Sequence, residues 1–136
     1  YLIASHSNIK TLCNRERNLT DGQILKLKQL DGYIGLFTNS NFTSLDKKLS
    51  YEQRRINFIN HLKYLIEILK FDYKKIIIST DDMNFSPDIN YHNLETYKLE
   101  TIYPLIRKDI ETNFSKEIAD AILIENSKNL IKQINQ

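Results

Sequence analysis

The chain has 136 residues, of which 41% are hydrophobic and 26% are charged, a composition typical of an ordinary globular domain. Its formal net charge is only +2, so nucleic acid and anionic membranes are not indicated as partners. The single cysteine, Cys13, excludes an internal disulfide and favours a reducing, cytoplasmic location, while a signal peptide upstream of Tyr1 would mean export.

Three short apolar runs predict buried parallel strands at residues 1–6, 33–38 and 75–80. The third contains three consecutive isoleucines at 76–78, a β-branched run that suits a strand covered on both faces. A helical pattern follows each run. This alternation of strand and helix predicts an α/β fold with a parallel sheet.

Two helices begin with the same capping signature. Thr20 and Gln23 precede the first, which Gly32 is expected to end, and Ser50 and Gln53 precede the second. The apolar stripe predicted for the second helix comprises Ile56, Ile59, Leu62, Leu65, Ile66 and Leu69. His61 lies within this helix and is expected to be partly exposed, not a ligand.

Two more helices are predicted towards the C-terminus. One spans about residues 94–112, where Pro104 either interrupts the helix or marks its start. The last follows Ser115 as its N-cap. Its predicted apolar positions are Ile118, Ala121, Ile122, Leu130, Ile131 and Ile134.

The residues that could carry chemistry begin where the first strand ends. His6 follows the apolar run, and Arg17 lies eleven positions later, in the loop before the first helix. Imidazole is a common zinc ligand, and a guanidinium is a natural clamp for a carboxylate. The alternatives are a histidine that hydrogen-bonds its own turn and an arginine that is simply a solvated surface charge.

The segments 4–8, 17–21 and 32–35, together with Cys13, resemble the membrane dipeptidase (renal dipeptidase) family. Members of that family are zinc-dependent dipeptidases built on an amidohydrolase-type (β/α)8 barrel of the TIM type. The resemblance runs through nearly the whole chain. It implies that residues 1–136 are the C-terminal part of a single barrel domain: units six to eight, plus a closing C-terminal helix.

The resemblance also implies roles for individual residues. His6 would bind one of two zinc ions, and Arg17 would bind the carboxylate of the dipeptide, with Arg15 as a weaker competitor. Asp81 would handle the proton during hydrolysis, with Asp82 as the second choice. This chain reads Ser-Thr-Asp-Asp-Met at 79–83, where many relatives have Gly-Ser-Asp-Phe-Asp-Gly. An acidic turn that caps the next segment is therefore the competing interpretation.

The function expected from the resemblance is hydrolysis of dipeptides by metal-activated hydroxide. The family's other ligands, a His-x-Asp pair, a glutamate and a second histidine, come from earlier strands. The chain begins at Tyr1, apparently inside a strand, so we expect an N-terminal part of the barrel as its partner and an inactive isolated fragment. A homodimer is possible. The alternatives are a barrel-derived binding or interaction protein that has lost its metal centre and an independent three-layer α/β domain.

Overall fold

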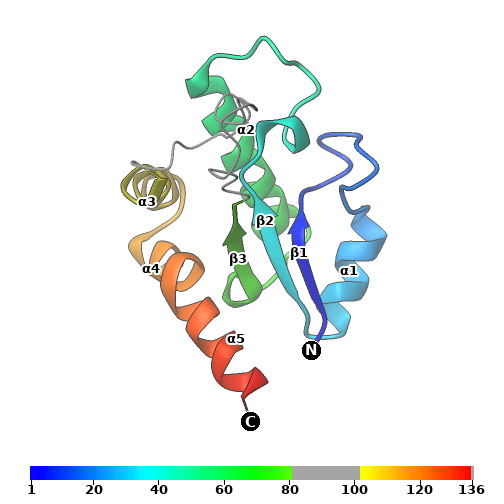
Figure 1. The fold of residues 1–136 in the computed structure, drawn as a ribbon, viewed down its shortest axis with the longest axis vertical. Coiled ribbons are helices and arrows are strands. Elements are labelled where there is room, and N and C mark those ends of the chain that lie inside the picture. The colour runs from blue at the N-terminus through cyan, green and yellow to red at the C-terminus, as the bar shows by residue number, and fades with distance from the viewer. Residues whose placement is uncertain (81–101, 136) are drawn as a thin grey trace, which may run out of the picture.

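Three parallel strands in the order β1–β2–β3 form the centre of the chain (Figure 1). Strand β1 spans Ile3–Ser7, β2 spans Tyr33–Phe37 and β3 spans Ile76–Ser79. The computed structural model describes residues 1–80 and 102–135. Asp81, Asp82 and the first part of the predicted third helix lie outside these residues. The predicted parallel α/β arrangement is confirmed for the part of the chain that is described.

Helices surround the sheet. They are α1 (Asp21–Gln29), α2 (Tyr51–Lys63), α3 (Ile102–Asn113), α4 (Lys116–Asp120) and α5 (Asn126–Ile134), with single π-helical turns η2 (Tyr64–Ile68) after α2 and η6 (Ala121–Glu125) between α4 and α5. Short 3₁₀ turns η1 (Ser40–Phe42) and η3 (Tyr73–Lys75) occur in the connections. Within residues 1–80 and 102–135, no helix is long and apolar enough to cross a bilayer.

The core lies between one face of the sheet and the helices. In Figure 1, α2 passes behind the sheet, α1 lies beside β1, and α4 and α5 lie beside β3. Alternate residues of the strands point into this core, including Ile34, Leu36 and Ile76. They meet Phe58 and Leu62 of α2, which are fully buried. The opposite face of the sheet carries the other strand residues.

Both predicted capping boxes are confirmed at Thr20–Gln23 and Ser50–Gln53. The end of α1 differs from the prediction. Asp31, not Gly32, has the left-handed backbone, with φ of 52°. Its N–H donates to Lys28 O, and the N–H of Gly32 donates to Leu27 O, as in a Schellman motif. Gly32 is needed for space, because a Cβ there would lie 2.9 Å from Leu2 O.

Several predicted core positions are wrong. Ile56, Ile131 and Ile134 are 52–59% exposed, whereas His61 is only 1% exposed. Most of the predicted stripe of the second helix is confirmed, because Ile59, Leu62 and Leu65 are buried and Ile66 and Leu69 pack against the core. The buried side of α2 also contains Phe58 and His61. Apolar spacing alone did not reveal the burial of His61, because a polar imidazole occupies that position. Pro104 lies in the first turn of α3, and residues 94–101 of the predicted helix lie outside the described part of the chain.

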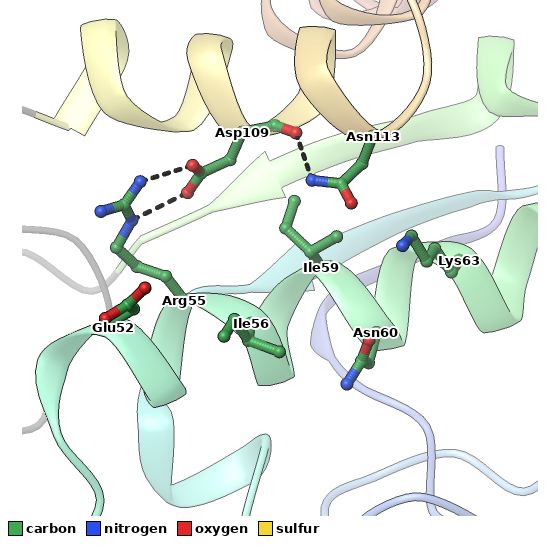
Figure 2. A pocket seen from close by; sticks show the side chains of 8 residues that line it. All are labelled: Glu52, Arg55, Ile56, Ile59, Asn60, Lys63, Asp109 and Asn113. Carbon is green, nitrogen blue, oxygen red and sulfur yellow. Dashed lines mark hydrogen bonds and ion pairs between the residues drawn. The ribbon is translucent and has the colours of Figure 1, made fainter.

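Helices α2 and α3 are joined by an ion pair at their surface. Figure 2 shows Arg55 of α2 facing Asp109 of α3, with guanidinium–carboxylate distances of 2.9 and 2.5 Å. The carbonyl of Asp109 also accepts a hydrogen bond from the Asn113 side chain, at 2.8 Å. A cavity of about 190 Å³ beside this pair is lined by Ile56 and other helix residues. Neither His6 nor Arg17 lines it.

The three strands make one close approach on the face opposite the helix core. The Ser79 hydroxyl of β3 reaches across β2 and donates to the carbonyl of Ser5 on β1. The backbone of Gly35 lies directly beneath this bond, and a Cβ there would overlap both oxygens. Glycine is therefore required at this position by lack of space.

We predict that Gly35→Ala lowers the free energy of unfolding by at least about 2 kcal/mol, because the methyl group displaces Ser5 or Ser79. Gly22→Ala is the matched control. A Cβ at Gly22, in the first turn of α1, meets no atom within 4 Å, so stability should stay unchanged or rise by up to about 1 kcal/mol. Urea unfolding measures both. Equal effects of the two substitutions would contradict the close approach.

Candidate functional site

An irregularity in β1 decides where the His6 side chain points. Ala4 pairs with Ile34 and Ser7 pairs with Leu36, so β1 uses three residues where β2 uses two. In a regular strand His6 would share the face of Ala4 and enter the helix core. The extra residue acts as a β-bulge and turns His6 to the opposite face. Its imidazole is half-buried at the carboxyl end of the strand.

The ring of Phe37, at the end of β2, brings His6 and Arg17 together. His6 contacts it edge-on, with ring centres 5.4 Å apart at 81°. The guanidinium carbon of Arg17 lies 5.5 Å from the centre of the same ring. Since both groups are within 5.5 Å of that centre, they are at most twice that distance, about 11 Å, apart. The sequence prediction that places these two residues in one site is therefore consistent with their positions.

Arg17 also lies over a second aromatic ring. Its guanidinium carbon is 5.5 Å from the centre of the Phe42 ring, and the two phenylalanine rings are 5.3 Å apart. In the described part of the chain, no carboxylate lies within ion-pair distance of Arg17. Arg17 is exposed and its guanidinium lies over aromatic rings, which suits a cation that binds an external anion.

Buried Asn8 connects the loop after β1 to the end of β2. Its Nδ2 donates to Phe37 O at 2.9 Å, and its Oδ1 accepts from Phe37 N at 3.1 Å. The side chain thus satisfies both backbone groups of Phe37, as a neighbouring strand would. Asn8 therefore holds the backbone of Phe37 in place, and with it the ring that contacts His6 and Arg17.

Asn18, which is 2% exposed, holds three loop segments together. Its Oδ1 accepts from Asn8 N at 3.3 Å, and its Nδ2 donates to the carbonyls of Cys13 and Phe42 at 2.9 and 2.8 Å. It follows Arg17 directly in the sequence. The loop that carries Arg17 is therefore fixed both to the end of β1 and to the turn that carries Phe42.

The neighbours Arg15 and Cys13 have structural contacts. Arg15 Nε donates to the carbonyl of Asn41 at 3.1 Å, so its guanidinium supports the loop after β2. Cys13 is buried, and burial raises the pKa of its thiol above the ordinary value, with Arg15 opposing this effect. A protonated, buried thiol is a poor nucleophile. Of the two arginines, Arg17 is the one that lies over the Phe37 ring beside His6, while Arg15 donates to a loop carbonyl.

His61 of α2 makes hydrogen bonds to the two loops of the site. Its Nδ1 accepts from Ile9 N at 3.1 Å, in the loop after β1, and its Nε2 lies 3.2 Å from Thr43 O, in the loop after β2. Both contacts fit the neutral ring, with the proton on Nε2. Burial lowers its pKa from 6.5 to about 4, opposed by the hydrogen bond to Thr43. His61 joins the two site loops and is not placed as a metal ligand.

His6 is the candidate metal ligand among the described residues. Its Nδ1 lies 3.0 Å from the Ser5 hydroxyl, so the ring makes the contact within its own turn that the competing interpretation expects, and this contact also orients the ring. No group of three potential ligands among His, Cys, Asp and Glu occurs within residues 1–80 and 102–135. A metal at His6 would therefore need ligands from outside these residues. Asp81 and Asp82 lie outside them.

Sequence reasoning singled out His6 and Arg17 as candidates but assigned no role to the residues that bring them together. Phe37 was expected only as part of a strand, and Phe42 as the start of a loop. Asn8 and Asn18 had no role of their own. A signal was present, because both asparagines lie in the segments that carry the family resemblance. Short polar residues that flank a candidate ligand could have been interpreted as loop-fixing side chains.

We predict that Asn18→Ala lowers the free energy of unfolding by about 2–4 kcal/mol, because it leaves buried backbone groups of three segments without partners. The exposed Asn14, four positions earlier, is the matched control. Asn14→Ala should change stability by less than about 0.5 kcal/mol. Urea unfolding compares the two, and a small effect at Asn18 would contradict its role as the centre of the loop network.

We also predict that His61 makes stability fall at acidic pH. Its folded pKa of about 4 lies below the unfolded value of 6.5, so the unfolded chain binds more protons between these values. The contribution of the neutral ring is complete above pH 6.5 and is lost as pH falls towards 4, by about 3 kcal/mol in total. His61→Gln removes this titration and should flatten the pH dependence of unfolding. An NMR titration of the ring near 6.5 in the native state would contradict the prediction.

Comparisons with known proteins indicate a family for this chain. A model of the membrane dipeptidase family, peptidase family M19, matches residues 2–135. An uncharacterised Klebsiella pneumoniae protein from the pqqA 5′ region is 32% identical over 72 residues, which are 53% of this chain and 27% of that protein. An uncharacterised Acinetobacter calcoaceticus protein from the PQQ-III 3′ region is 30% identical over 66 residues, or 48% and 21% of the two chains.

Solved structures share the fold. A Rhodobacter sphaeroides metallopeptidase, bound to a phosphinate mimic of the dipeptide L-Ala-D-Ala, superimposes with a TM-score of 0.71 at 20% identity over 96% of this chain. Dipeptidase AC, a metallopeptidase of family M19, gives a TM-score of 0.70 at 19% identity over 96% of this chain. An amidohydrolase from Pseudomonas aeruginosa gives 0.71 at 14% identity over 91%.

The chain spans only part of each relative: 21–27% of the two curated proteins and 35–42% of the three solved chains. The family match, in contrast, covers nearly every residue of this chain, including His6, Arg17, both buried asparagines and both phenylalanines. The chain belongs to the membrane dipeptidase family, peptidase family M19.

Proposed function

We propose that the parent protein is a metal-dependent dipeptidase and that this chain forms the last three units of its (β/α)8 barrel. The observation that carries the proposal is the Phe37 ring, which contacts both the His6 imidazole and the Arg17 guanidinium. The closeness of an imidazole and a guanidinium supports a metal ligand and an anion clamp in one site. Membership of the dipeptidase family supports the reaction class.

The unpaired edge of β1 supports the proposal that the chain belongs to a barrel. The three described strands form a sheet with two edges, and β1 is one of them. Beside β1 lies a mainly apolar groove of about 230 Å³, lined by residues in or next to β1 and α1 that include Leu2, Ile3 and Leu27. In the complete barrel, a preceding strand and helix would cover this groove.

Each residue has one proposed task. His6 would bind a metal through Nε2, as one ligand of a two-zinc centre whose other ligands come from the N-terminal part. Metals at this centre would activate water and polarise the scissile carbonyl. Arg17 would hold the free carboxylate of the substrate with two N–H groups. Asp81 would accept the proton from the attacking water and pass it to the leaving amine.

The closeness of His6 and Arg17 supports a short substrate. The ring centre of His6 and the guanidinium carbon of Arg17 are at most about 11 Å apart, because both lie against the Phe37 ring. In a dipeptide the scissile carbonyl and the free carboxylate are only one residue apart, roughly 3.5 Å along the chain. One such substrate could therefore meet a metal held by His6 and the Arg17 guanidinium together.

Dipeptide hydrolysis by the full-length parent tests this proposal. We expect turnover that depends on metal, about two zinc ions per chain, and lower metal content in His6→Ala. Arg17→Met should raise KM for a dipeptide by about 30- to 100-fold, because charge-assisted hydrogen bonds to the carboxylate are lost. The same substitution should have little effect on a dipeptide amide, which has no carboxylate.

Arg15→Met is the matched control. It removes a guanidinium two residues away that donates to a loop carbonyl, so it should lower stability without changing the preference for dipeptide over amide. Residues 1–136 alone should show no turnover, since most ligands are absent from this segment. A metal-free, inactive parent would instead support a binding protein that has lost its chemistry. Turnover by residues 1–136 alone would contradict the shared site.

A further inference from the structure

We propose that Phe42 is a positioning residue: its ring, together with that of Phe37, holds the Arg17 guanidinium in the orientation that binds the substrate carboxylate. This inference rests on the proposed function and deepens it, since it names the residue that makes the clamp selective. Phe42 comes from the turn after β2, whereas Arg17 comes from the loop after β1. The clamp is therefore assembled from two loops.

The geometry is that of a cation over a pair of rings. The guanidinium carbon lies 5.5 Å from both ring centres, and the rings are tilted by 34° with centres 5.3 Å apart. Phe37 is buried and Phe42 is half-buried. The two rings therefore support the charged end of a side chain that has no carboxylate partner among the described residues.

A face-on contact with the rings would leave the hydrogen-bonding groups of Arg17 available. When an aromatic ring contacts the flat face of a guanidinium, the five N–H groups point outward in the plane. A carboxylate can then accept two parallel hydrogen bonds from one edge. An unsupported arginine on an exposed loop would have to lose side-chain entropy each time it bound substrate. The rings remove part of that cost before binding.

The position of Phe42 is itself fixed. Its backbone N–H donates to Asn39 O at 3.0 Å, and its carbonyl accepts from the Asn18 side chain at 2.8 Å. Asn18 is the residue next to Arg17. One buried amide therefore connects the backbone that carries the arginine to the backbone that carries the ring, and it keeps the two in register.

The test compares Phe42→Leu with Phe42→Tyr in the full-length parent, using a dipeptide and the matching dipeptide amide. Leucine keeps apolar volume but removes the ring, so KM for the dipeptide should rise about 3- to 10-fold with kcat nearly unchanged. KM for the amide should not change. Tyrosine keeps the ring face and should restore the wild-type KM. A rise in KM that is equal for dipeptide and amide would overturn the proposal.

Two controls separate positioning from general loop damage. Phe114→Leu makes the same change at a half-buried phenylalanine between α3 and α4, and should leave both KM values unchanged. In the Arg17→Met background, Phe42→Leu should have no further effect on KM for the dipeptide, because its ring acts through the arginine. Additive effects of the two substitutions would overturn the proposal.

A readout without turnover separates this inference from the proposed function. Two aromatic rings should shift the Arg17 Nε–H proton signal of the full-length protein upfield, and Arg17→Met identifies that signal by its loss. Phe42→Leu should move it towards the position of a solvated arginine, whether or not the protein hydrolyses dipeptides. If dipeptides are not hydrolysed but the signal moves, the proposed function fails and the ring support stands. An unmoved signal overturns the ring support.

Discussion

The Phe37 ring is the contact on which the rest of the site depends. It lies at the end of the central strand, buried, with both of its backbone groups bonded to the side chain of Asn8. His6 and Arg17 come from the neighbouring strand and its following loop, and both meet this ring. A rigid aromatic ring on a central strand is a precise spacer, because neither its backbone nor its side chain has room to move.

The supporting structure is built mainly from polar side chains that bond to backbone. Asn8 and Asn18 connect the loops after β1 and β2 on the side of the site, and His61 connects the same two loops from α2. Each is buried and satisfied, so replacing it would leave unpaired backbone groups. The same loops carry the residues proposed to bind metal and substrate. The stability of these loops and the geometry of the site therefore depend on the same hydrogen bonds.

Much of the fold could be predicted from the sequence. The strands were found because apolar runs of four to six residues mark them, and the helix starts because capping boxes are short local motifs. The roles proposed for His6 and Arg17 were suggested by the family resemblance. The bulge in β1 could not be predicted, because it depends on pairing with β2. The roles of Phe37, Phe42 and buried His61 depend on contacts between segments far apart in the chain, which apolar spacing does not encode.

The most direct test is a crystal structure of the full-length protein with its metals and a phosphinate dipeptide mimic, with anomalous scattering to locate the metals. We expect Nε2 of His6 to bind a metal. The carboxylate of the mimic should accept hydrogen bonds from two N–H groups of Arg17, and this arginine should still lie against the Phe37 ring. A metal centre away from His6, or a carboxylate bound elsewhere, would contradict the proposal.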